Sequence, residues 1–119
     1  MEGFSRTDRV GDEIKRAVGI LIEKEVKDPR VGFVTVTSVK VAGDLSVATV
    51  YVTVGENEDP EEALRGLQAA SGFIRKRLGE TVRLRTTPEL RFVYDSSVER
   101  GFRMDALLKR IADERDASS

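Results

Sequence analysis

The residues able to carry out chemistry in this chain are limited to carboxylates, amines, guanidinium groups and hydroxyls, because its 119 residues include neither histidine nor cysteine. That composition excludes thiol nucleophiles, imidazole acid–base catalysis, disulfides and most zinc or transition-metal sites. Asp95, Ser96 and Ser97 place an acid beside hydroxyls, but no base is present to activate a serine, so we interpret them as a turn and helix cap. We predict a protein that is not an enzyme and that needs no metal or cofactor.

Basic side chains are the stronger candidates for function, because they are concentrated in one stretch. Residues 75–91 hold six basic residues against two acidic ones, whereas residues 56–62 hold five acidic residues and no basic one. The net charge of the chain is only −1, yet segregated charge still presents a basic surface to a polyanion, since screening confines each field to roughly 8 Å. We predict that this stretch binds nucleic acid phosphates through Arg75, Lys76, Arg77, Arg83 and Arg85.

A second and more dilute basic set lies nearer the N-terminus. Arg9, Arg16 and Lys27 fall within about 20° of one another at 100° per residue of helix, with acidic residues close by, and Arg30 follows. We include these four as candidate contacts at the edge of the interface. For both sets the alternative is a solvated face with local ion pairs. Surface aromatics are expected to be few, which favours recognition of phosphates and shape over base stacking.

The elements that must position these residues follow from hydrophobic spacing. Ser5, Thr7 and Asp8 are candidate N-caps for a first helix, whose apolar residues recur at helical spacing until residues 27–29 interrupt the pattern. Two strands are predicted at residues 33–41 and 46–54, joined as a hairpin by the turn cluster 42–45. A phase change near Ser38 indicates a bulge in the first of them.

A second helical region begins with Asp59 as cap and Pro60 in the first turn. The helical spacing of its apolar residues continues across three small residues, Ala70, Ser71 and Gly72, which we interpret as a kink. Gly79 is a predicted C-terminal cap. Without a side chain at Gly72, another backbone could approach closely and the amides at the start of the second half of the helix could meet a phosphate. Alternatively, Gly72 only relieves crowding where a helix crosses the sheet, and we favour this structural role.

A third strand is expected within residues 82–95, and a last helix uses Met104, Leu107, Leu108 and Ile111. The chain is therefore predicted to form one α+β domain, residues 4–112, in which helices pack on one face of a three-stranded sheet and leave the other face available. Residues 113–119 are expected to be a flexible tail. No apolar stretch approaches the roughly 20 residues of a membrane span, so a cytoplasmic protein is expected.

Five short motifs, in order and at compatible spacing from about Arg9 to Leu108, resemble the ribosome-binding factor A family. The first three are Lys27-Asp28-Pro29-Arg30, Asp44-Leu45-Ser46-x-Ala48-x-Val50-Tyr51-Val52 and Ala70-Ser71-Gly72-Phe73-Ile74-Arg75. The others are Leu84-Arg85 with Pro88-Glu89-Leu90, and Tyr94-Asp95-x-Ser97. Each motif is weak alone, and their order makes the resemblance specific.

The resemblance implies a type II KH-like domain, ordered helix-strand-strand-helix-kink-helix-strand with a C-terminal helix, in which Ala70, Ser71 and Gly72 replace the usual G-x-x-G loop. It implies a monomeric, non-catalytic factor that binds 16S ribosomal RNA on the immature small (30S) ribosomal subunit. Such a factor supports late maturation, including 5′-end processing of that RNA, and matters most in the cold. A generic KH-like single-stranded RNA-binding protein, or a protein-interaction module that uses the free sheet face, remains the alternative.

Overall fold

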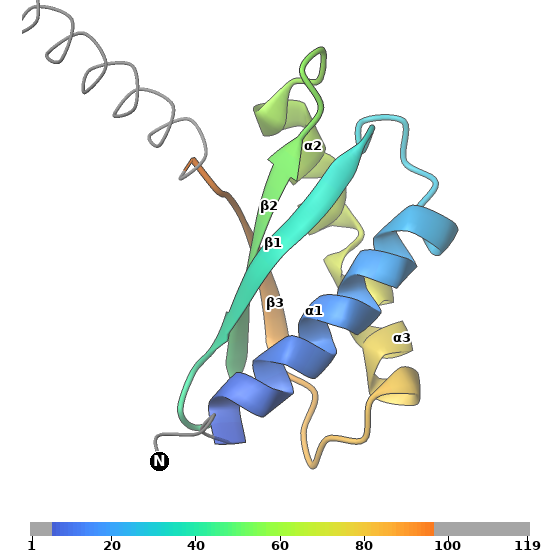
Figure 1. The fold of residues 1–119 in the computed structure, drawn as a ribbon. Coiled ribbons are helices and arrows are strands. Elements are labelled where there is room, and N and C mark those ends of the chain that lie inside the picture. The colour runs from blue at the N-terminus through green and yellow to red at the C-terminus, as the bar shows by residue number, and fades with distance from the viewer. Residues whose placement is uncertain (1–5, 97–119) are drawn as a thin grey trace, which may run out of the picture.

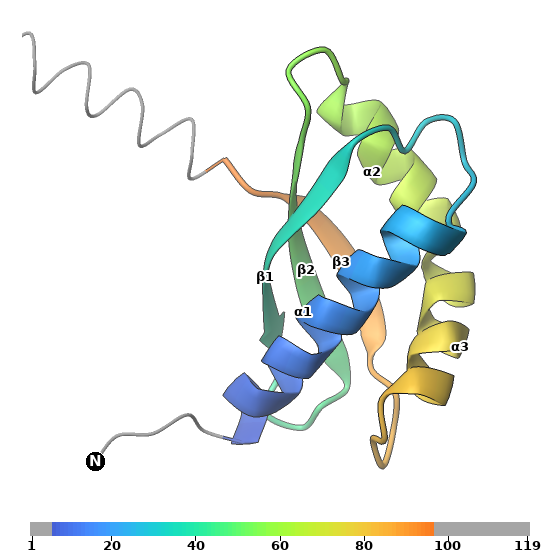
Figure 2. The ribbon, with the colours of Figure 1, turned by 45° about the vertical axis from the view of Figure 1, so that its right-hand side comes forward.

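A mixed three-stranded sheet with helices on one face is the framework of residues 6–96, the part of the chain that the computed structural model describes (Figure 1). The elements are α1 (Arg6–Glu25), β1 (Val34–Val41), β2 (Val47–Val54), α2 (Pro60–Ala69), α3 (Ser71–Thr81) and β3 (Glu89–Tyr94). Figure 2 shows the helices on one side of the sheet and its other face uncovered by these elements. This arrangement confirms the predicted α+β class and element order. The predicted last helix, the tail and both predicted domain boundaries lie outside the described residues.

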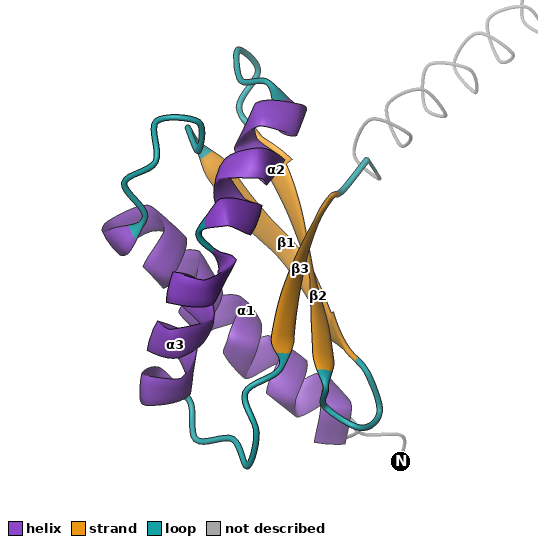
Figure 3. Cartoon of the chain, turned by 180° about the vertical axis from the view of Figure 1, so that it is seen from behind, coloured by secondary structure: helices purple, strands orange, loops and turns teal. Residues whose placement is uncertain are grey.

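The strand order is β1-β2-β3, with β2 in the centre. β1 and β2 form the predicted antiparallel hairpin, and its register shifts between Val36 and Ser38, which confirms the bulge. β3 runs parallel to β2, with Val47 opposite Glu89 and Val52 opposite Tyr94. A parallel partner requires a crossover connection, and α2 and α3 supply it, as the view from behind shows (Figure 3). The crossover places both helices over the same sheet face as α1.

The core lies between this sheet face and the three helices. On β2 the alternate residues Ala48, Val50 and Val52 are fully buried, as the period of two predicts for a strand covered on one side. Helical spacing supplies the opposing side chains, which include Ile14, Val18, Leu67, Ile74 and Leu78. Their burial fixes the rotation of each helix, so the charged residues on the remaining faces point outward. Within residues 6–96, no helix is both long and apolar enough to cross a bilayer.

Helix boundaries differ from the sequence prediction in three places. α1 begins at Arg6, so Thr7 and Asp8 lie in its first turn and do not cap it, whereas Ser5 lies outside the described residues. The same helix ends at Glu25, before the interruption predicted at residues 27–29, so Lys27 lies in the following loop and not on the helix face with Arg9 and Arg16. α3 continues through Gly79 to Thr81, so Gly79 is not its cap.

The third strand is shorter than predicted, because residues 82–88 form a loop that joins α3 to β3. Leu84 belongs to that loop and packs half-buried against the core. Apolar spacing alone could not separate this loop from the strand, since an anchored loop also buries its apolar residues. Pro88 is fully buried just before β3 and marks the true beginning of the strand.

Candidate nucleic-acid interface

The break between α2 and α3 lies at Ala70, within the triplet where the sequence predicts a kink. Ala70 is the last residue bonded to α2, through its amide to the Gly66 carbonyl oxygen at 3.0 Å, and the first bonded to α3, through its carbonyl to the Ile74 amide at 2.9 Å. No side chain caps the start of α3. The Ser71 hydroxyl donates to the Gln68 carbonyl oxygen at 2.7 Å, so it satisfies the end of α2.

No other segment comes close to Gly72, so neither the close backbone approach nor the crowding considered for this position occurs there. A Cβ atom built at this position would meet nothing within 4 Å, and no glycine in the described part of the chain has a positive φ. The nearby chain instead approaches about two turns later, where a Cβ on Gly79 would lie 2.8 Å from the Thr87 hydroxyl. Gly72 therefore lines an open hollow of about 360 Å³, together with Arg75, Lys76, Gly79 and Thr87.

Arg75 fastens the loop 82–88 to α3. Its Nε and Nη2 atoms donate to the Thr87 carbonyl oxygen at 3.2 and 2.8 Å, and its side chain stays exposed. The acceptor is a neutral carbonyl, so the guanidinium is oriented while its positive charge stays uncompensated. The same loop carries Arg83 and Arg85.

Three more cations lie on α3 and on the loop that follows it. Lys76, Arg83 and Arg85 are exposed, and none of them forms an ion pair with the residues that the structure describes. Together with Arg75 they are called the basic patch below. Charges left without a partner and in contact with solvent are the ones that can bind phosphate at little desolvation cost.

Arg77 has a different environment from its neighbours. Its Nε atom lies 2.9 Å from Glu25 Oε1 at the end of α1, and its Nη1 atom pairs with Glu80 one turn along α3. Hydrogen bonds to Glu25 and Glu80 raise the pKa of Arg77. The side chain joins α1 to α3, and its charge is offset by two carboxylates.

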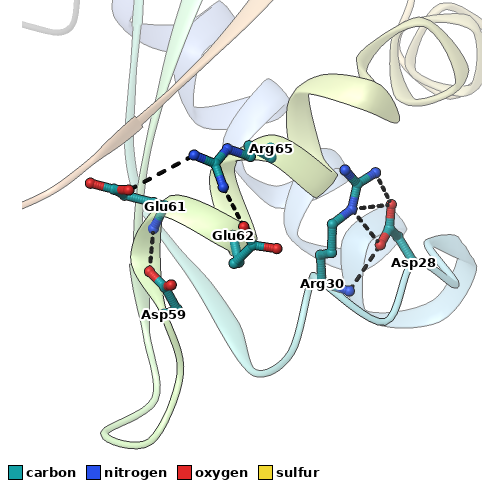
Figure 4. A network of polar contacts seen from close by, with 6 residues as sticks. All are labelled: Asp28, Arg30, Asp59, Glu61, Glu62 and Arg65. Carbon is teal, nitrogen blue, oxygen red and sulfur yellow. Dashed lines mark hydrogen bonds and ion pairs between the residues drawn. The ribbon is translucent and has the colours of Figure 1, made fainter.

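Arg30 is also paired, in the loop that follows α1 (Figure 4). Its guanidinium and its amide all donate to the Asp28 carboxylate, with the Nη2–Oδ2 distance at 2.6 Å. These bonds lower the pKa of Asp28 and raise the pKa of Arg30. Close by, Arg65 of α2 pairs with Glu61 and Glu62. Asp28, Arg30, Glu61, Glu62 and Arg65 are called the paired cluster below.

The remaining candidates lie on and just after α1. Arg9, Arg16 and Lys27 are exposed, and none forms an ion pair within residues 6–96. Arg16 lines a groove between α1 and β1, which is separate from the hollow at Gly72. The structure therefore divides the predicted basic residues into the patch on α3 and its loop, a set on and after α1, and two arginines paired with carboxylates.

Phe73 was missed by the sequence prediction, which expected few surface aromatics. Its side chain is 46% exposed and follows Gly72 directly at the start of α3. The signal lay in the spacing, because Ile74 and Leu78 define the buried face of α3 and position 73 falls outside it. In the described part of the chain, no three acidic side chains gather as they would around a metal ion.

Comparison with known proteins gives a consistent result. The family model "Ribosome-binding factor A" matches residues 6–108. The chain is similar to the crystal structure of ribosome-binding factor A from Thermus thermophilus, with 32% identity and a TM-score of 0.69 over 76% of this chain and 97% of that one. A Thermus thermophilus model fitted into a cryo-EM map of a 30S complex gives 32% identity and a TM-score of 0.65, over 76% of this chain and 96% of that one. An NMR structure of a Thermotoga maritima protein, described as related to the same factor, gives 31% identity and a TM-score of 0.67, over 78% of this chain and 90% of that one.

Proposed function

The chain belongs to the ribosome-binding factor A family, and on that premise we propose that it binds the small (30S) ribosomal subunit. The observation that carries the proposal is the similarity to the Thermus thermophilus factor fitted into a 30S complex, which spans nearly all of that relative. The kink with Gly72 and the side chain of Arg77 belong to one folded domain. We propose that this domain extends over residues 4–112.

We propose further that the basic patch contacts ribosomal RNA. Arg75, Lys76, Arg83 and Arg85 offer positive charge that no carboxylate within residues 6–96 offsets. The hollow at Gly72 gives a phosphate room to approach α3, and exposed Phe73 beside it offers a face on which an unpaired base could stack. Arg9, Arg16 and Lys27 would contribute at the edge, while Arg30 and Arg77 would contribute least.

The proposed role is to support late maturation of the subunit, including processing of the 5′ end of 16S ribosomal RNA, without catalysing it. A chain with neither histidine nor cysteine has few groups for RNA cleavage. Purified protein should leave precursor RNA intact, while cells that lack it should accumulate unprocessed 5′ ends in the cold. Cleavage by the purified chain would contradict this role.

The decisive experiment is co-sedimentation with immature and mature 30S subunits at several salt concentrations. Removing one phosphate contact should flatten the slope of log K against log salt by about 0.7 to 0.9, so Arg83→Gln with Arg85→Gln should reduce it by roughly 1.4 to 1.8. The matched control replaces Arg65 and Arg91 by glutamine, since they pair with Glu61, Glu62 and Glu89. It removes the same charge and should leave the slope unchanged.

Two results would contradict the proposal. Equal slopes for both double variants and the wild type would remove the basic patch from the interface. Binding of short single-stranded oligonucleotides as tight as that of immature subunits would instead favour the generic RNA-binding alternative, with Phe73 as its stacking residue.

A further inference from the structure

A groove of about 900 Å³ lies between the second half of α1 and the beginning of β1. At the other end of this pair the two elements are in close contact, since a Cβ on Gly11 would lie 3.0 Å from the Val39 carbonyl oxygen. Toward the C-terminal end of α1 the two elements separate, as Figures 1 and 2 both show, and Gly19 and Ile20 line the groove. The groove is therefore a product of how α1 crosses β1 and not of a missing side chain.

The lining of this groove contains the two most exposed large apolar side chains of the described residues. Phe33 is 73% exposed and Ile20 is 49% exposed, and both line it together with Val31 and Val36. β1 is also an edge strand, paired only with β2 among residues 6–96. Exposed apolar side chains gathered in one groove mark an interaction surface more often than isolated ones do.

The described chain ends at the end of the sheet where the groove lies, on the face that the helices leave uncovered. Tyr94 lies opposite Val52, at the end of the sheet where β1 begins. The Thr37 hydroxyl in the bulge of β1 donates to Asp95 Oδ2 at 2.6 Å. Val36, next to Thr37, lines the groove from the helix side, so a segment that follows Ser96 reaches the groove by passing around the edge of β1.

The part of the chain beyond the described residues has the composition to fill the groove. Met104, Leu107, Leu108 and Ile111 recur at helical spacing, and such an apolar stripe must be buried against another surface. The seven residues 97–103 can span up to about 24 Å when extended, enough to pass around an edge strand. A tethered segment also has an effective concentration on the order of millimolar, which a separate partner lacks.

Charges at the rim fit the same occupant. Lys15 and Arg16 stand with Asp12 and Glu23 along the α1 side of the groove. The segment carries both signs as well, with Asp105, Lys109 and Arg110 among its apolar residues. An amphipathic segment of mixed charge suits this rim better than a strongly acidic or basic partner would.

We propose that residues 104–111 of this chain dock into the groove between α1 and β1, with their apolar stripe against Phe33 and Ile20. The docked segment protects the outer edge of β1. It leaves the basic patch, on α3 and its loop, open.

Because the chain has no cysteine, a single engineered cysteine in the full-length protein can carry a nitroxide spin label. Gly19→Cys places the label in the groove, and Gly72→Cys places it at the hollow on α3. Both positions have no atom within 4 Å of a built Cβ, so the two variants are matched in their tolerance of the new side chain. NMR signals of residues 104–111 should lose intensity with the label at position 19 and keep it with the label at position 72.

A second variant tests the contact itself. Phe33→Asp in the Gly19→Cys protein should restore the signals of residues 104–111. The high exposure of Phe33 argues against unfolding as the cause, and the amide spectrum of residues 6–96 checks this. Equal effects from both labels, or none from either, would overturn the proposal. So would loss of signal only when labelled and isotope-enriched copies are mixed, because that result assigns the groove to a second copy of the chain.

Discussion

The paired cluster and the basic patch contain similar side chains in opposite electrostatic situations. In the paired cluster, Arg30 and Arg65 each meet a carboxylate two to four residues away in sequence. In the basic patch, Lys76 and Arg85 meet none among the described residues, and Arg75 bonds a carbonyl oxygen instead. A count of basic residues alone would predict that the two regions bind a polyanion equally well. Their arginines and lysines differ, however, in whether their charge is available to a polyanion.

The way in which each region fixes its arginines explains the difference. A carboxylate orients a guanidinium and cancels its charge, while a backbone carbonyl orients it and leaves the charge intact. The loop 82–88 has no acidic residue, so the Thr87 carbonyl is the acceptor that Arg75 finds. An interface that binds phosphate needs the second arrangement, because its positive charge must remain uncompensated until the ligand arrives.

The glycines of the two regions should respond to substitution in opposite ways, and the largest effect is expected beside the paired cluster. A Cβ on Gly66 would lie 2.6 Å from Val31 Cγ2 and 3.2 Å from the Cβ of Arg30. Gly66→Ala should therefore lower the free energy of unfolding by about 1 to 3 kcal/mol, as overpacking does. Urea denaturation measures the change, and an unaltered midpoint would show that the loop of Arg30 can move aside freely.

At the hollow beside the basic patch, Gly72→Ala should have the opposite sign. Nothing lies within 4 Å of the new methyl group, and alanine in a helix is favoured over glycine by roughly 0.5 to 1 kcal/mol. The midpoint of urea unfolding should rise. A fall would mean that Gly72 has a packing role after all.

These two glycines show what sequence reasoning could and could not determine. Spacing located the kink at Ala70, the bulge near Ser38 and the cap at Asp59, because each depends on residues close in the chain. The neighbour of a glycine depends on which distant segment packs there. Sequence reasoning considered a close approach or crowding at Gly72, whereas in the structure the close approaches occur at Gly66 and Gly79.

The candidate site divides in the same way. That residues 75–85 are rich in cations is visible in the sequence, but the pairing of Arg77 with Glu25, 52 residues away, requires the fold. The pairing of Arg30 with Asp28 is local and could have been anticipated from their spacing of two residues. The Arg75 bond to Thr87 could not, since backbone carbonyls carry no sequence signal.

Single arginine substitutions sharpen the comparison for binding. Arg85→Gln should flatten the salt dependence of 30S binding by about 0.7 to 0.9, the effect of one phosphate contact. Arg30→Gln removes the same formal charge from the paired cluster and should change that slope much less, because Asp28 already offsets it. Co-sedimentation with 30S subunits across a salt series compares the slopes of the two variants. Equal slopes for the two variants would show that pairing in the free protein does not decide which arginines bind.

The smallest expected effect concerns pH and belongs to the paired cluster alone. Hydrogen bonds from the Arg30 side chain and amide hold the pKa of Asp28 below its ordinary value. A carboxyl with a lowered pKa in the folded state stabilises the fold above its unfolded pKa, and that contribution is lost as the pH falls through the folded pKa. Asp28→Asn keeps an oxygen for the Arg30 amide but removes the charge. The variant should therefore unfold at a slightly lower urea concentration than the wild type at pH 7, and the two midpoints should converge in acid below the folded pKa of Asp28. If the difference between the two urea midpoints stays constant between pH 7 and acid, the effect of Asp28 comes from its shape and not from its charge. The paired cluster and the basic patch would then differ less in electrostatics than the geometry indicates.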